Sequence, residues 1–82
     1  MLLLIEVAES TLHSDRGEKA ELYAAAGIKD YWIVNLVDLC IEVYRKPRAG
    51  KYCDVQTYNV AQSLSPLAFP EISLDVGYVF AR

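Results

Sequence analysis

The sequence predicts an α/β fold: a mixed sheet of about four to five strands with one main helix after the first strand. Three observations support this fold class. An unbroken apolar run opens the chain, a segment with helix start and stop signals follows it, and most of the remainder is rich in β-branched and aromatic residues. Since the chain has 82 residues, we expect residues 1–82 to form a single domain.

The first strand is predicted over residues 1–8, and its run of Leu and Ile is typical of a strand that is buried on both faces. Glu6 interrupts this run. A carboxylate in such a strand costs several kcal/mol if it stays charged without a partner, and the usual remedies are a cation, a metal ion or a raised pKa. Glu6 is therefore a candidate functional residue.

The helix is predicted to follow a polar loop at residues 9–14. Asp15 and Glu18 have the spacing of a helix start, residues 18–26 form the body, and Gly27 is expected to end the helix in a left-handed conformation.

Lys19 is predicted to lie on the face of this helix that packs on the sheet. Leu22, Tyr23 and Ala26 follow it by three, four and seven residues, which places all four side chains on one stripe. A lysine is unusual on such a stripe, and a helix that folds back across its own strand would bring Lys19 to Glu6.

The rest of the chain is predicted to complete the sheet. Tyr31 and Trp32 in the second strand are expected in the core, and the third strand is expected to be covered on one face. The predicted elements are a strand at 31–35, a reversal at 36–38, a strand at 39–45, a hairpin loop at 46–51, a strand at 52–58, a wrap around the sheet edge at 62–70, a short strand at 71–76 and an apolar tail at 78–80.

Composition and net charge limit the classes of function that the chain can have. A net charge of −3 and a pI near 4.9 argue against a strongly basic nucleic-acid clamp. The hydrophobic fraction of 54% is more than a small domain easily hides, so we expect a partner or a larger assembly. No segment is predicted to span a membrane or to act as a signal peptide.

The two cysteines are too few for a zinc site and indicate reduced thiols in a cytoplasmic protein. Centring the hairpin loop at 46–51 places Cys53 opposite Tyr44 rather than Cys40, so a disulfide is not expected.

Glu6 and Lys19 together have the chemistry of half of a metal-dependent nuclease site. A carboxylate can hold Mg²⁺, the metal activates a water for attack on phosphorus, and a nearby lysine steadies the negative charge on the phosphate. The same spacing also fits an ion pair that only holds the helix to the strand, or a lysine whose head reaches out to solvent.

Several segments of the chain together match the pattern of a known family. They are Leu3–Ser10, Asp15–Arg16 with Lys19, Leu22–Ala24, Ala26–Ile28, Tyr31–Val34, Val43–Arg45, Ser65–Pro66 and Phe69–Pro70. With them the sequence resembles the Uma-type endonucleases, a family abundant in cyanobacteria that belongs to the PD-(D/E)XK, restriction-endonuclease-like superfamily. The resemblance covers nearly the whole chain.

The resemblance implies a Mg²⁺-dependent hydrolysis of phosphodiester bonds in DNA. Glu6 matches the acidic residue of the (D/E)XK element and Val7 the position whose backbone carbonyl helps to hold the metal. Ala8 stands where the element's lysine is expected, and Lys19 on the helix matches the lysine of this family. Asp15 matches a recurrent aspartate, and we assign it to helix capping and to orientation of Lys19.

The family's Pro-Asp element, whose aspartate is the other metal ligand, is missing from this sequence. We therefore expect the chain to correspond to the C-terminal half of the restriction-endonuclease-like domain, without its N-terminal helix and first strands. The absence of the second metal-binding aspartate leaves two alternatives, an active and an inactive nuclease. The alternative is a non-catalytic α/β module that forms a homo-oligomer through an exposed strand edge.

A further feature is the basic hairpin of Arg45, Lys46, Arg48 and Lys51. It is either a contact for phosphates or a solvated loop.

Overall fold

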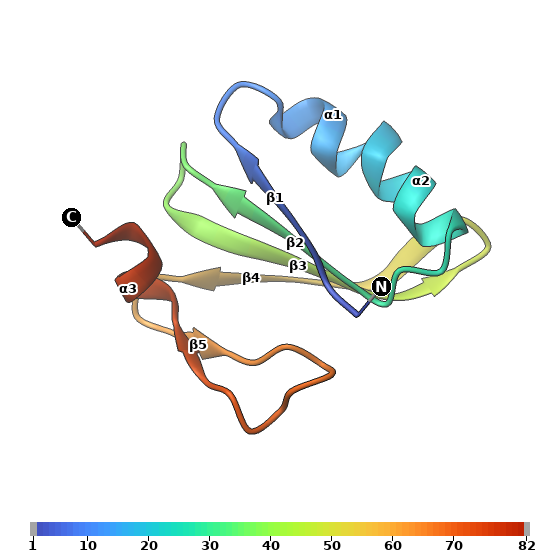
Figure 1. Cartoon of the computed structure of the whole chain (residues 1–82). Coiled ribbons are helices and arrows are strands. Elements are labelled where there is room, and N and C mark those ends of the chain that lie inside the picture. The colour runs from blue at the N-terminus through green and yellow to red at the C-terminus, as the bar shows by residue number, and fades with distance from the viewer. Residues whose placement is uncertain (1, 82) are drawn as a thin grey trace.

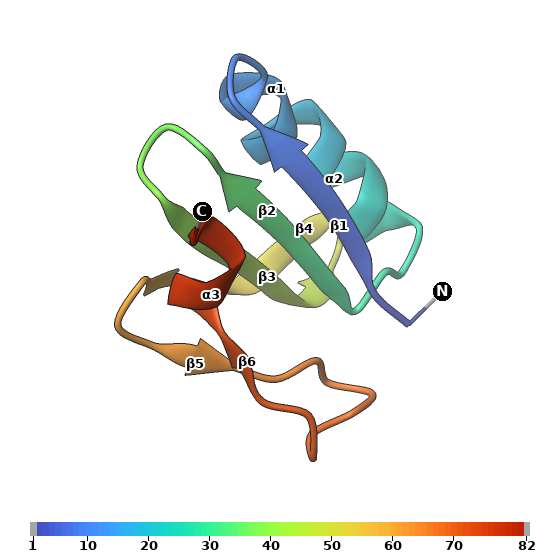
Figure 2. The ribbon, with the colours of Figure 1, turned by 60° about the vertical axis from the view of Figure 1, so that its left-hand side comes forward.

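The computed structural model describes residues 2–81 and shows a four-stranded mixed sheet with helices on one face and the C-terminal segment on the other (Figures 1 and 2). The predicted fold class is confirmed. The elements are β1 (Leu4–Ala8), α1 (Leu12–Arg16), α2 (Glu18–Ala25), β2 (Asp30–Asn35), β3 (Cys40–Arg48), β4 (Lys51–Asn59), β5 (Ser63–Leu64), β6 (Leu74–Asp75) and α3 (Val76–Phe80).

The sheet has the order β1-β2-β3-β4. β1 and β2 are parallel and are connected by α1 and α2, whereas β2, β3 and β4 are antiparallel neighbours. The predicted order of strand, helix and three strands is therefore correct. No helix among residues 2–81 has the length and apolar character needed to cross a membrane.

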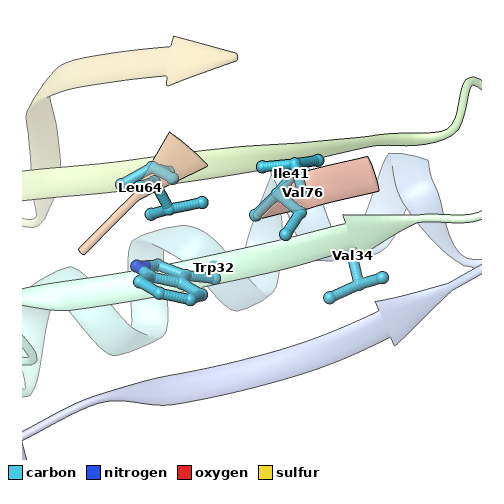
Figure 3. Close-up of a cluster of buried hydrophobic side chains, with 6 residues drawn as sticks. Trp32, Val34, Ile41, Leu64 and Val76 are labelled. Carbon is cyan, nitrogen blue, oxygen red and sulfur yellow. The ribbon is translucent and has the colours of Figure 1, made fainter. Parts of the chain in front are cut away.

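β2 is the centre of the structure, and all six of its residues are buried. On one face Trp32 and Val34 pack with residues of β3, β5 and α3, as Figure 3 shows for Ile41, Leu64 and Val76. On the other face Tyr31 and Ile33 pack with Ala8, Ala20 and Tyr44 beneath the helices. The prediction that Tyr31 and Trp32 belong to the core is confirmed.

β1 differs from the prediction of a strand buried on both faces. It is an edge strand, and Ile5 and Val7 are 48% and 64% exposed, because the C-terminal segment covers the middle of the sheet and leaves this end open. An apolar run does not distinguish a central strand from an edge strand.

The helical region begins earlier than predicted. Residues 9–14 were expected to form a loop, but α1 starts at Leu12 and includes Asp15, and Gly17 separates it from α2. The buried side chains of α2 are the small residues Ala20 and Ala24, so the predicted stripe of Lys19 with Leu22 and Ala26 is wrong. The predicted left-handed Gly27 is confirmed by its φ of 77°.

The hairpin between β3 and β4 is tighter than predicted, because its turn consists of Ala49 and Gly50 alone, both with positive φ. This matches the twist that two-residue hairpin turns require. Val55 rather than Cys53 lies opposite Tyr44. Both cysteines are free, as expected from the sequence.

β3 is also covered on both faces from Cys40 to Tyr44, not on one face. The C-terminal segment lies against the sheet face instead of wrapping an edge, with Leu64 and Val76 buried in the core. The strand predicted at 71–76 is reduced to β6, and the predicted tail forms α3.

Asp30 fixes the C-terminal segment to the sheet. Its fully buried carboxylate accepts hydrogen bonds from Trp32 Nε1 at 2.7 Å, Arg45 Nε at 2.9 Å and the Leu67 amide at 2.9 Å. Arg45 in turn donates to the Ser65 carbonyl at 2.7 Å. One carboxylate therefore connects β2, β3 and the loop after β5.

We predict that Asp30→Ala lowers the free energy of unfolding by about 3 kcal/mol, because three donors lose their buried acceptor at once. Urea denaturation followed by Trp32 fluorescence measures this change. Glu71→Ala, which removes an exposed carboxylate, is the matched control and should stay within about 0.5 kcal/mol of the parent. Equal urea midpoints for the two variants would contradict this role of Asp30.

Candidate active site at the sheet edge

Glu6 and Lys19 meet, as the sequence predicts. Lys19 Nζ, at the start of α2, lies 3.1 Å from Glu6 Oε2 on β1, and the Tyr23 hydroxyl lies 3.4 Å from the same oxygen. The Lys19 and Glu6 side chains are 40% and 29% exposed, so the pair lies at the edge of the sheet within reach of solvent. A ligand can therefore approach both charged groups.

Asp15 is the third charged residue of this site. Its Oδ1 lies 3.0 Å from Lys19 Nζ, and its Oδ2 accepts a hydrogen bond from Thr11 Oγ1 at 2.8 Å. The contact of Oδ1 is an ion pair by distance, but this buried oxygen receives no hydrogen bond of good geometry within residues 2–81. The expected contact with Lys19 is present, whereas the predicted capping role is wrong because Asp15 lies inside α1.

The two carboxylates determine the protonation of Lys19. Asp15, followed by Glu6, raises the pKa of Lys19 to about 12. Lys19 is therefore an ammonium ion at neutral pH. It can stabilise negative charge but is unsuited to accept a proton as a general base.

Tyr31 holds the end of α1 in place. Its hydroxyl donates a hydrogen bond of 3.0 Å to the Asp15 carbonyl, and its ring makes an edge contact with Tyr23 at 5.0 Å. Burial is the main cause that raises the pKa of Tyr31, so the hydroxyl stays protonated and remains a donor. The central strand thus positions Asp15 and, through it, Lys19.

The oxygen atoms around Glu6 suit a hard cation. Lys19 and Tyr23 both donate to Oε2, which leaves Oε1 for another ligand. The Ala8 carbonyl accepts from Leu36 on the β2 side. Because successive carbonyls of a strand point in opposite directions, the Val7 carbonyl faces the open edge. Carboxylate and carbonyl oxygens are the kind of ligand that Mg²⁺ prefers, and this ion keeps several waters and binds few protein ligands.

No group of three or more His, Cys, Asp or Glu side chains in residues 2–81 is arranged to hold a metal ion. Within the described residues, Glu6 therefore does not belong to a cluster of three such side chains.

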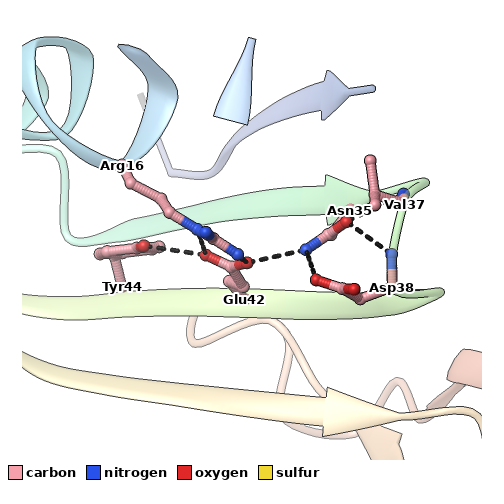
Figure 4. Close-up of polar contacts among 6 residues, drawn as sticks. All are labelled: Arg16, Asn35, Val37, Asp38, Glu42 and Tyr44. Carbon is pink, nitrogen blue, oxygen red and sulfur yellow. Dashed lines mark hydrogen bonds and ion pairs between the residues drawn. The ribbon is translucent and has the colours of Figure 1, made fainter. Parts of the chain in front are cut away.

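Glu42 is a buried acid that the sequence reasoning missed. Figure 4 shows its carboxylate between Arg16 of α1, Asn35 of β2 and the Tyr44 hydroxyl. Arg16 binds it through Nε and Nη2, Asn35 Nδ2 donates at 3.0 Å and Tyr44 at 3.0 Å. The network attaches α1 to the sheet through Arg16, the residue that follows Asp15. The signal that identified Glu6, a carboxylate within an apolar run, also applies to Glu42.

These contacts set the charge state of Glu42. Its burial, the largest single effect, would raise its pKa, but hydrogen bonds from Arg16, Asn35 and Tyr44 together outweigh burial and hold the pKa below its usual range. Glu42 is therefore ionised in the folded protein at neutral pH.

The structure is a small mixed α/β domain with an acid–lysine pair at its sheet edge. Residues 1–77 match the Uma2 family model, whose description is "Putative restriction endonuclease", and the chain belongs to this family. The family resemblance inferred from the sequence is thus confirmed. Comparison with curated proteins and with solved structures found no match.

We predict that Glu42→Gln destabilises the protein by about 2 kcal/mol at pH 7, because Arg16 and Asn35 lose an ionised acceptor. The lowered pKa of Glu42 gives a contribution that is present above the ordinary value of 4.5 and is lost as the pH falls through the lower folded value. The difference between parent and variant should therefore shrink towards pH 3.

Urea midpoints measured from pH 7 to pH 3 test this expectation. Glu9→Gln, at an exposed position, is the control and should show a small difference from the parent that does not vary in this way. A difference for Glu42→Gln that stays constant across the range would contradict an ionised Glu42 in the folded protein.

Proposed function

We propose that this chain provides the Glu6–Lys19 part of the active site of a Mg²⁺-dependent endonuclease that hydrolyses phosphodiester bonds in DNA. The observation that carries the proposal is the Lys19 ammonium, which lies within 3.1 Å of two carboxylates at an accessible sheet edge. Membership of the Uma2 family, whose description is "Putative restriction endonuclease", supports the reaction class and the DNA substrate.

Each residue has a distinct role in this proposal. Glu6 Oε1 and the Val7 carbonyl would hold the Mg²⁺ ion, which when bound supplies an activated water and offsets phosphate charge. Lys19 reaches a phosphate oxygen and stabilises the charge that develops on it in the transition state. Asp15 and Tyr23 position the Lys19–Glu6 pair and do not contact the DNA.

Metal affinity should be low. The resemblance implies a second metal-binding aspartate in a Pro-Asp element, and the 82 residues contain no Pro-Asp pair. One carboxylate with one carbonyl leaves most of the Mg²⁺ coordination to water and to substrate phosphates. The proposal includes correspondence to the C-terminal half of the nuclease domain, and a cytoplasmic location, which the two free cysteines favour.

We predict that Glu6→Gln abolishes divalent-metal binding and that Glu6→Gln and Lys19→Gln each lower metal-dependent nicking of supercoiled plasmid by about 100-fold or more. Mn²⁺ binding is measured by the loss of the free-ion EPR signal. Nicking is measured in Mg²⁺ or Mn²⁺ and should cease in EDTA.

Glu9→Gln is the matched control, since it makes the same substitution at an exposed position three residues further along. It should retain the metal binding of the parent. If Glu6→Gln binds Mn²⁺ as the parent does, or if Lys19→Gln nicks at the parent rate, the active-site assignment is wrong.

A second candidate function is association of two copies through β1. β1 is an edge strand whose side away from β2 pairs with no strand in residues 2–81, and Leu2, Ile5 and Val7 are exposed there. Such edges pair readily with another strand. The opposite edge, β4, is more polar and exposes Val55 among Lys51, Gln56, Thr57 and other polar residues.

We predict for this candidate that Val7→Lys converts a dimer into a monomer, because a charge on the paired strand opposes edge-to-edge contact. Sedimentation equilibrium at high protein concentration, with and without Mg²⁺, measures the change. Val55→Lys places the same charge on the opposite edge strand and should leave the dimer intact. A monomeric parent chain would exclude this function.

A further inference from the structure

The lysines and arginines of the described residues fall into two groups. Arg16, Lys19 and Arg45 each form an ion pair with a carboxylate. The second group has no ion-pair partner within residues 2–81 and consists of Lys29, Lys46, Arg48 and Lys51. Lys29 lies between α2 and β2, and the other three lie on the β3–β4 hairpin. All four are exposed.

Three of these cations line one hollow at the hairpin end of the sheet. Lys29, Lys46 and Arg48 surround an open space of about 460 Å³, together with Pro47, Cys53 and Leu67. No carboxylate is among these lining residues. In an acidic protein of net charge −3, three unpaired cations brought together from separate segments form a local positive site.

The backbone at Lys46 explains how three consecutive residues can line the same hollow. In a regular strand Lys46 and Arg48 would face one side and Pro47 the other. Lys46 instead has a φ of 57°, and the ladder passes from Arg45–Asp54 to Pro47–Tyr52 without a pair at Lys46. This left-handed conformation is uncommon for a residue other than glycine.

Contacts of Tyr52 and Asp30 fix the walls of the hollow. Tyr52 donates a hydrogen bond of 2.6 Å to the Ile28 carbonyl, which holds the hairpin against the segment that carries Lys29. The Leu67 amide is bound by Asp30 at 2.9 Å. The hollow is thus formed by segments that are tied together in the folded chain.

We propose that the hollow lined by Lys29, Lys46 and Arg48 binds the phosphodiester backbone of DNA, apart from the Glu6–Lys19 pair. The inference rests on the proposed function, which supplies DNA as the ligand. Cations bind the phosphates, and the apolar surfaces of Pro47 and Leu67 suit the deoxyribose between them. Contacts of this kind orient a duplex without reading its sequence.

The test is the salt dependence of DNA binding in EDTA. Fluorescence anisotropy of a labelled duplex gives Kd at several KCl concentrations, and each phosphate contact contributes about 0.9 to the slope of log Kd against log [KCl]. The double variant Lys46→Gln/Arg48→Gln should lose about two units of slope. Lys51→Gln, on the same hairpin but outside the hollow, is the matched control and should keep the parent slope.

Cys53 provides a second measurement at the hollow itself. It is exposed and lines the hollow, whereas Cys40 is buried, so N-ethylmaleimide should alkylate Cys53 selectively. Saturating duplex should slow this alkylation several-fold, and high salt should restore the rate. Trp32 fluorescence confirms that each variant is folded.

Three results would overturn the inference: no binding at low salt, an unchanged slope in the double variant, or an unprotected Cys53 in DNA-bound protein. These results are separable from failure of the proposed hydrolysis, because binding is measured without metal and with Glu6 and Lys19 intact. Phosphate binding without any Glu6-dependent nicking would refute the nuclease proposal alone. Glu6-dependent nicking with an unchanged salt slope would refute this inference alone.

Discussion

The complete burial of β2 is the constraint on which the rest of the structure depends. With both faces covered, every polar group of this strand needs a partner inside the protein. Its two polar end residues supply the connections that hold the neighbouring segments. Asp30 binds Arg45 and the loop at Leu67, while Asn35 Oδ1 accepts from the amides of the β2–β3 turn at 2.9 Å. The burial of one strand therefore organises both ends of the sheet.

The position of the helices depends on charge as much as on apolar packing. α2 buries the small side chains of Ala20 and Ala24, and Tyr23 of α2 and Leu12 of α1 are half-buried against the core, so the apolar contact of the helices with the sheet is small. The Arg16–Glu42 ion pair attaches α1 to β3, and Lys19 attaches α2 to β1 through Glu6 and to α1 through Asp15. Pairs with one buried member hold geometry well, because separating them leaves a buried charge without a partner. The site geometry at Glu6 follows from this arrangement.

The sequence predicts the features that depend on local pattern. The fold class, β2, the left-handed Gly27 and the meeting of Glu6 with Lys19 follow from periodicity, spacing and a misplaced charge. Prediction from the sequence fails where the burial of a strand depends on which distant segment covers it. β1 is as apolar as a central strand, and nothing local in the chain indicates that the C-terminal segment packs over β2 and β3 and leaves Val7 exposed.

Glu42 is a second case in which a local sequence pattern does not show the surroundings of a residue. Its environment is assembled from Arg16, Asn35 and Tyr44, and the distance in sequence between Arg16 and Glu42 is 26 residues. The sequence predicts one covered face for this strand, whereas both faces are covered from Cys40 to Tyr44, because one strand viewed alone does not show which elements pack above it. Long-range polar networks of this kind become visible only when the topology is known.

The pairing of the lysines and arginines links the fold to the proposed chemistry. Three of them neutralise buried or half-buried carboxylates, so they add little to the field outside the protein. Lys29, Lys46 and Arg48, which have no ion-pair partner in residues 2–81, line a hollow without a carboxylate, whereas Lys51 lines another hollow together with Glu21 of α2. An acidic chain can therefore present one positive end to a polyanion.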